Sequence, residues 1–161
     1  MTEFATTHFG VICFKEDDVL TFPTGLPGFW HATRFVLLPH PNNTSIRYLQ
    51  SADVPGLRFI LVAAFSVMPD YQLAIDPIDM KSLLPSCDLN PDALHPTNLD
   101  SWFIISTPQP ALLTINMLAP VVISNMSRRG VQAVRSDTLY SHAFPLDSAT
   151  LELARTRTSI C

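Results

Sequence analysis

Two strand-like runs follow each other in residues 112–125, which read LLTINMLAPVVISN. In the first run, apolar and polar residues alternate, as expected for a strand with one apolar face. The apolar positions are Leu113, Ile115 and Met117, and the polar positions between them are Thr114 and Asn116. This run therefore predicts a strand over residues 113–117.

The second run, Val121–Ser124, follows directly after Ala119 and Pro120. Its first three residues are β-branched, which favours a buried, pleated strand. Pro120 has no backbone N–H to donate to a ladder, so it belongs at the start of this strand or at a bend. We therefore expect two adjacent strands in the core of a β-rich fold.

Prolines and glycines divide the rest of the chain into short segments. There are 14 prolines and 5 glycines, and the spacing of the prolines excludes long helices. Many short strands with turn signals between them indicate a barrel or a sandwich. We expect a mainly β, compact, β-barrel-like single domain of short strands with one or two short helices. The other predicted strands are Phe9–Phe14, Val19–Phe22, Thr33–Leu38, Ile46–Ser51, Leu57–Phe65, Tyr71–Ile75, Trp102–Ser106, Val131–Arg135 and Leu139–Phe144.

One helix is predicted at Asp79–Leu84, where Asp76 or Pro77 opens a turn and Pro85 ends the helix. We expect the β domain to span residues 1–146. The tail, residues 147–161, is expected to form a short helix or to be frayed. A strand is an alternative for the tail, because apolar and polar residues alternate there.

Charge is unevenly distributed along the chain. Residues 1–127 hold 11 Asp and Glu against 5 Lys and Arg, a net charge of −6, whereas residues 128–161 hold 3 against 5, a net charge of +2. Phosphate contacts need a basic face, so the acidic body argues against direct binding of RNA or DNA. A protein partner with a basic surface is favoured instead.

Membrane and secretion signals are missing from the sequence. The longest uninterrupted apolar run, Phe59–Phe65, is far shorter than the roughly 20 residues that a membrane helix needs. The amino terminus has no apolar signal-peptide core, and the three cysteines have no C-x-x-C spacing. We therefore expect a cytoplasmic protein with no membrane partner.

Motifs of catalysis are also missing. The sequence has no G-x-S-x-G, G-x-G-x-x-G or P-loop, and its five histidines show no H-x-H or H-E-x-x-H spacing. We expect no catalytic residue, no cofactor and no metal, and by elimination a binding protein. The alternative is a small β-barrel enzyme or ligand-binding protein of unknown substrate, with a pocket lined by His31, His40 and Asp70.

Five short strings match, in order, the motifs of one known family. The opening stretch is similar to the signature T-x-N-L-x-A-P-I-V-I-N, with Ser124 in place of the last Asn. The others are residues 22–29 (FPTGLPGF, for F-x-x-G-L-P-G-F), 48–51 (YLQS, for L-Q-S), 68–71 (MPDY, for P-D-Y) and 130–134 (GVQAV, for G-x-Q-x-V). From about Phe9 to Leu146 the chain therefore resembles the FliW family of flagellar assembly factors. The basic loop at residues 126–130 and the tail depart from that pattern.

The resemblance implies two partners. FliW proteins bind CsrA, an RNA-binding homodimer that represses flagellin synthesis, and they also bind flagellin. Flagellin in the cytoplasm occupies the FliW protein; once flagellin is exported, the freed protein captures CsrA, away from its RNA surface, and relieves repression. We expect the free protein to be a monomer. A second alternative is a secretion chaperone that binds flagellin only.

Five polar residues are candidates for partner contact: Gln50, Asp70, Tyr71, Asn116 and Gln132. Four of them, all except Gln50, also have a structural explanation. Asp70 follows a proline and fits a turn, and the Tyr71 hydroxyl needs a hydrogen-bond partner if it is buried. Asn116 and Gln132 lie on apolar strands, where a polar side chain more often satisfies a backbone group than binds a partner.

Overall fold

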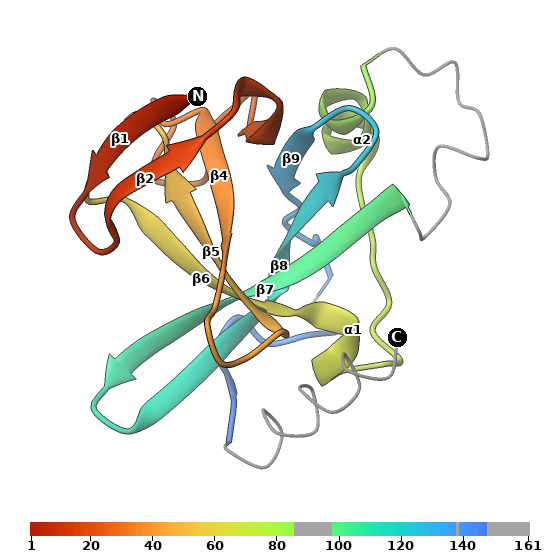
Figure 1. The fold of residues 1–161 in the computed structure, drawn as a ribbon. Helices are drawn as coiled ribbons and strands as arrows, with labels where there is room; N and C mark the ends of the chain where they lie inside the picture. The colour runs from red at the N-terminus through yellow and green to blue at the C-terminus, as the bar shows by residue number, and fades with distance from the viewer. Residues whose placement is uncertain (86–97, 138, 148–161) are drawn as a thin grey trace.

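A computed structural model of the chain describes residues 1–85, 98–137 and 139–147 (Figure 1). The predicted tail lies outside the described residues except for Asp147, and the domain boundary before it stays a prediction. The strands are β1 (Thr2–Thr6), β2 (Gly10–Phe14), β3 (Val19–Thr21), β4 (Arg34–Pro39), β5 (Ile46–Ser51), β6 (Arg58–Ala63), β7 (Leu99–Gln109), β8 (Leu112–Ser124), β9 (Arg129–Gln132) and β10 (Phe144–Pro145). The helices are η1 (Glu16–Asp18), α1 (Ala64–Val67) and α2 (Pro77–Leu83).

Seven strands close into a barrel. Their order is β8-β7-β6-β5-β4-β3-β9, and β9 pairs back with β8. The ladders are antiparallel except for β3–β9, which is parallel and pairs Thr21 with Arg129. β10 adds to β8 outside this ring, and β1 and β2 form a separate hairpin. The predicted mainly β, barrel-like fold with two short α-helices is confirmed.

Alternate residues of the strands fill the barrel interior, because successive side chains of a strand point to opposite faces. Full burial of one such Leu or Phe stabilises the fold by about 1.5–3 kcal/mol. The buried residues of the hydrophobic cluster inside the barrel are Leu20, Phe22, Leu26, Ala32, Phe35, Leu49, Leu61, Trp102, Val121 and Ile123.

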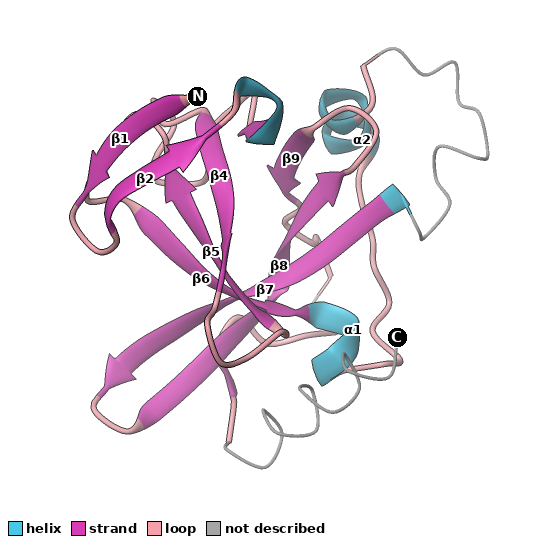
Figure 2. Ribbon diagram, viewed as in Figure 1, coloured by secondary structure: helices cyan, strands magenta, loops and turns pink. Residues whose placement is uncertain are grey.

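Three covers protect the outer faces of the barrel. The β1–β2 hairpin lies over Val19 and Val36, whereas α2 lies over Val122 and Val131. The third cover, which includes α1 and the segments around Tyr71 and Leu146, packs on β5–β8. In Figure 2 the hairpin lies on the left of the barrel and the α-helices on the right. No helix in the described ranges is both long and apolar enough to cross a bilayer.

The two strands predicted from residues 112–125 form one strand, β8, which is interrupted by a bulge of four residues. Trp102 of β7 pairs with Val121, but Ile104 pairs with Asn116, so four residues, 117–120, lie opposite Phe103. Pro120 sits at the end of this bulge, directly before pairing resumes, as its missing N–H requires. The interruption was predicted correctly, but the continuity of the strand was not.

Other predicted strands need correction. The segment Tyr71–Ile75 forms no ladder, although Leu73 and Ile75 pack on the outer clusters. Of Leu139–Phe144, only Phe144 pairs. Strand β1 was missed, and the end of the predicted strand Leu57–Phe65 turns into α1. Period-two alternation indicates an extended segment with one buried face, but it does not show that a neighbouring strand is available.

Candidate partner-binding groove

A groove of about 250 Å³ lies where three distant parts of the chain meet. One wall is the turn after β3, the second is the first turn of α2, and the third is the end of β9 with the residues that follow it. The lining residues are Thr24, Gly25, Pro27, Trp30, Asp76, Asp79, Val131, Gln132 and Val134. Two of the five family-like strings, at residues 22–29 and 130–134, therefore meet in this groove.

Gly25 fixes the shape of the turn wall. Its φ is +66°, a left-handed conformation, and a Cβ there would lie 2.5 Å from the carbonyl oxygen of Phe29. The Gly25 N–H donates to the Phe22 carbonyl at 2.9 Å, and the Phe29 N–H donates to the Leu26 carbonyl at 2.7 Å. Phe22 and Leu26 are buried in the core, so the turn is anchored while Trp30 remains 65% exposed.

The acidic wall comes from the start of α2. Asp76 is the N-cap, and its Oδ1 accepts a hydrogen bond from the Asp79 N–H at 2.7 Å, with Pro77 in the first turn. This confirms the helix predicted there, with both ends shifted by one or two residues. Burial, and then the neighbouring Asp76 carboxylate, raise the pKa of Asp79 above its ordinary value.

β9 forms the third wall and lies close to the barrel core. A Cβ on Gly130 would lie 2.4 Å from Cζ of the buried Phe22, so only glycine allows this approach. The Gln132 Nε2 donates to the Ala119 carbonyl at 3.1 Å and ties β9 to the bulge. Beyond the strand, Val134 is 53% exposed beside the groove.

The chemistry of the groove suits recognition. None of the nine lining residues is basic, two are carboxylates, and Trp30 and Val134 offer apolar surface. The lining offers neither a histidine nor a cysteine that could act as a base or nucleophile. The groove therefore favours a ligand that combines positive charge with apolar surface.

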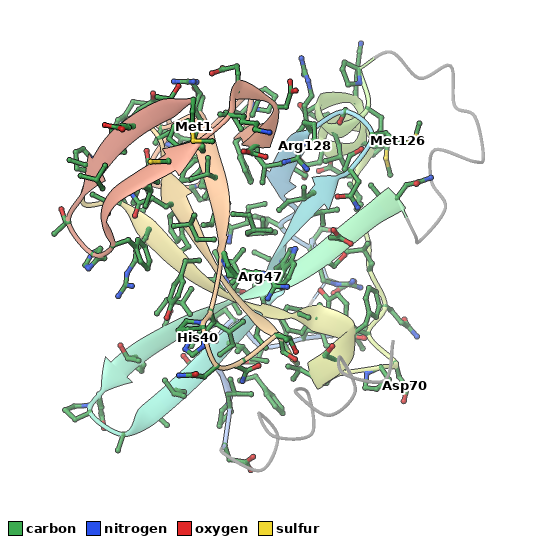
Figure 3. All side chains as sticks on the ribbon, viewed as in Figure 1. Met1, His40, Arg47, Asp70, Met126 and Arg128 are labelled. Carbon is green, nitrogen blue, oxygen red and sulfur yellow. The ribbon has the colours of Figure 1, made fainter. Side chains whose placement is uncertain are left out.

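Three of the five candidate residues meet at the bulge in β8, where each satisfies backbone groups (Figure 3 draws the side chains). Asn116 Oδ1 accepts from the N–H groups of Leu118 and Ala119 at 3.1 and 3.0 Å. The Tyr71 hydroxyl donates to the Met117 carbonyl at 2.7 Å, and Gln132 donates to Ala119 as described above. The structural explanation given for these residues is the one observed, and partner contact by them stays a prediction.

The other two candidates lie apart from the bulge. Gln50 is fully buried, and its Nε2 donates to the carbonyls of Ser51 and Pro55 at 3.0 and 3.3 Å, which closes the turn between β5 and β6. Asp70 is exposed in a turn closed by the Tyr71 N–H, which donates to the Met68 carbonyl at 3.0 Å. Gln50 and Tyr71 are thus interior residues, and Asp70 is the most accessible of the five.

The pocket considered for an enzyme, lined by His31, His40 and Asp70, is not formed. His40 and Asp70 lie on different sides of the molecule in Figure 3, and His40 Nδ1 accepts from the Asn42 N–H at 3.0 Å. Within residues 1–85, 98–137 and 139–147, no three His, Cys, Asp or Glu side chains are grouped as a metal site would need.

Trp30, Asp76 and Asp79 were not among the candidates from the sequence. A usable signal existed in the sequence. Trp30 is a large apolar residue directly after a turn with two glycines, and it belongs to no segment in which apolar and polar residues alternate. Asp76 and Asp79 follow Trp30 by 46 and 49 residues in the chain, and only the fold brings them beside it.

Comparison with known proteins agrees with this architecture. A sequence model of the family described as "FliW protein" matches residues 3–146. The flagellar assembly factor FliW of Desulfitobacterium hafniense (strain DSM 10664 / DCB-2) is 32% identical over 138 residues, which cover 84% of this chain and 85% of the relative. That of Heliobacterium modesticaldum is 31% identical over 150 residues, covering 90% and 92%.

A solved structure gives the same result. The crystal structure of a flagellar assembly factor FliW superposes with a TM-score of 0.75 at 28% identity, and the match covers 92% of this chain and 99% of that one. The fold, the family match and the relatives point to one family of assembly factors, which is not a family of enzymes. The chain belongs to the FliW family of flagellar assembly factors.

Proposed function

We propose that this protein couples flagellin supply to flagellin synthesis by binding two partners in turn. One is CsrA, the RNA-binding homodimer that represses flagellin synthesis, and the other is flagellin itself. Membership of the FliW family carries the proposal. The acidic body, with a net charge of −6 over residues 1–127, supports a partner with a basic surface.

The switch follows from competition for one small protein. While flagellin is plentiful in the cytoplasm, it occupies this protein and CsrA represses translation. After flagellin is exported, the freed protein captures CsrA and repression ends. Bound beside the RNA path of CsrA, the acidic body would also repel phosphates, and this repulsion weakens as salt rises.

The proposal places the protein in the cytoplasm as a monomer when free, without direct contact to nucleic acid. It is tested by mixing the purified chain with CsrA, and separately with flagellin, from the same organism and following elution on size-exclusion chromatography. We expect a shift to earlier elution in both mixtures. A shift with flagellin alone would leave the flagellin-only chaperone, and no shift with either partner would refute the proposal.

A further inference from the structure

A second surface of the molecule lies on the outer face of β5 and β6. Leu49 and Leu61 on these strands face the barrel interior. Successive side chains of a strand point to opposite faces, so Tyr48 and Arg58 face outward. Both are partly exposed, so this part of the sheet is accessible from outside.

The tip of the β1–β2 hairpin places an aromatic ring beside this pair. The hairpin reaches the turn before β6, where the Thr7 N–H donates to the Pro55 carbonyl at 3.0 Å (Figure 1). The ring centroids of Phe9 and Tyr48 are 4.9 Å apart. The guanidinium carbon of Arg58 is 5.3 Å from the centroid of each of these rings, so the cation is held by two aromatic contacts.

The guanidinium of Arg58 has no acidic partner. No hydrogen bond or ion pair of its side chain is seen within residues 1–85, 98–137 and 139–147, where the ion pairs use Arg34 and Arg135 as cations. The carboxylate of the turn before β6, Asp53, pairs with Arg34 at 3.3 Å. The two rings attract the cation, but its five N–H donors have no oxygen acceptor in the described structure.

His40 extends this surface. Its ring stacks on Tyr48 with the centroids 5.8 Å apart. Its Nδ1 accepts from the Asn42 N–H at 3.0 Å, so the proton of the neutral ring lies on Nε2, where it is a further hydrogen-bond donor. We call the set Phe9, His40, Tyr48 and Arg58 the Arg58 platform.

A carboxylate supplies what the Arg58 platform lacks. A guanidinium and a carboxylate form two parallel hydrogen bonds, and the rings already hold the guanidinium, so little side-chain freedom is lost on binding. The rings also offer apolar surface to a neighbouring side chain of the ligand. A nucleic acid fits less well, because its many phosphates would meet a body with a net charge of −6 over residues 1–127.

We propose that the Arg58 platform is a docking site for an acidic segment of a protein partner. The carboxylate of a Glu or Asp in that segment accepts hydrogen bonds from Arg58, and an apolar side chain next to it packs against Phe9 or Tyr48. The charge complementarity of the unpaired guanidinium selects this occupant. This docking site does not depend on the proposed function, since neither CsrA nor flagellin is needed to test it.

The test uses two short peptides and the full chain. The acidic probe is the acetylated and amidated peptide Ala-Leu-Glu-Leu-Ala, and the neutral probe has Gln in place of Glu. Binding is followed by NMR through the backbone amides of β5 and β6 and the side-chain Nε–H of Arg58. The variants are Arg58→Gln and Arg58→Lys, and the control Lys81→Gln removes an exposed cation from α2. Circular dichroism with thermal melting verifies that each variant folds.

We expect the acidic peptide to shift the signals of Arg58 and Tyr48 saturably, and the neutral peptide to bind about tenfold or more weakly. Arg58→Gln should weaken binding of the acidic peptide by a similar factor. Arg58→Lys should weaken it less, because the ammonium keeps the charge but loses the planar fork. Lys81→Gln should bind like the wild type.

Four outcomes would overturn the docking site. Absence of a saturable shift up to the solubility limit of the peptide, or equal binding of the two peptides, would leave Arg58 only the role of holding the β1–β2 hairpin. Unchanged binding by Arg58→Gln would place the peptide elsewhere; if that variant does not fold, unchanged binding by Arg58→Lys decides the same point. Tighter binding of a single-stranded oligouridine at the same signals would assign the platform to nucleic acid. Dimers of the wild type that Arg58→Gln abolishes, seen by light scattering, would assign it to a second copy of this chain.

Discussion

Polar side chains around the bulge of β8 act on the backbone of this chain. Residues 117–120 lie opposite the single residue Phe103, so the β7–β8 ladder cannot pair all their backbone groups, yet backbone groups in an interior must be hydrogen-bonded. Part of that bonding comes from the side chains of Tyr71, Asn116 and Gln132. The backbone N–H of Arg135 adds a further bond, to the Leu118 carbonyl at 3.0 Å. From the sequence, Asn116 and Gln132 were expected to bond to backbone groups. It did not show that Tyr71, Asn116 and Gln132 all bond to the backbone of the same bulge.

Removal of the Tyr71 hydroxyl tests this role. The substitution Tyr71→Phe leaves the buried Met117 carbonyl without that donor and should lower the free energy of unfolding by about 1–3 kcal/mol. Tyr48→Phe is the matched control, because no hydrogen bond of the Tyr48 hydroxyl is seen within the described residues. Urea unfolding measures both. Equal stability of Tyr71→Phe and the wild type, or a loss of CsrA binding without a loss of stability, would assign Tyr71 to the interface instead.

Asp137 gives a prediction about pH. Hydrogen bonds from the almost fully buried Arg135 side chain, at 2.7 and 3.0 Å, lower the pKa of Asp137 below its ordinary 3.8. A carboxylate whose pKa is lower in the folded state than in the unfolded state stabilises the fold at every pH above its unfolded-state pKa. This stabilisation is lost as the pH falls through the pKa of the folded state. The stability difference between the wild type and Asp137→Asn should therefore be constant near neutral pH and shrink below pH 3.8 in urea unfolding across a pH series. A difference that persists or grows in acid would contradict the ion pair.

At the scale of elements, local patterns predicted most strands and missed what depends on neighbours. The strand Ile46–Ser51 was predicted with its observed ends, because both its alternation and its flanking turns are local signals. The segment Tyr71–Ile75 has the same alternation but packs as an extended strap without a ladder. The bulge in β8 also depends on partners far away in the chain, so Pro120 indicated an interruption but not the strand that continues across it.

The turn that carries Trp30 provides a comparison between two glycines. Gly25 and Gly28 both have a left-handed φ, which costs an L-residue about 1–2 kcal/mol. A Cβ at Gly28 would meet nothing within 4 Å, whereas at Gly25 it would clash with the backbone of Phe29 and Trp30. Gly25→Ala should therefore lower the free energy of unfolding by about 1–3 kcal/mol more than Gly28→Ala does, because of overpacking.

Thermal or urea unfolding of the two variants measures this difference. Gly25→Ala should also weaken partner binding, because the backbone of Trp30 must move to make room. Equal losses of stability in the two variants would show that the turn is not held in the shape described.

At the scale of the whole molecule, closure of the barrel creates the groove. The parallel contact between β3 and β9 brings the turn that follows β3 beside β9, and α2 packs over β9 through Leu83. The sequence predicted the barrel-like fold and the two strings that line the groove. It could not predict that Trp30 and Asp79 line the same groove, since closure joins strands more than a hundred residues apart, at Thr21 and Arg129.

The proposed partner switch, in which flagellin and CsrA exclude each other, would be a property of the whole molecule. Flagellin must lower the affinity for CsrA, and by linkage CsrA must lower the affinity for flagellin by the same factor. A coupling of about 2–3 kcal/mol, a factor of tens to over a hundred, moves most of the protein from one partner to the other. In a small closed barrel, overlap of the two binding surfaces is the simplest source of this coupling.

The most direct test of the account is a titration of flagellin into a preformed complex of this protein with the CsrA homodimer. Light scattering coupled to chromatography identifies the species present, and the affinity of each partner is measured with and without the other. We predict that flagellin displaces CsrA and that each partner weakens the other by the same factor. A stable ternary complex in which both affinities are unchanged would contradict the partner switch for this protein.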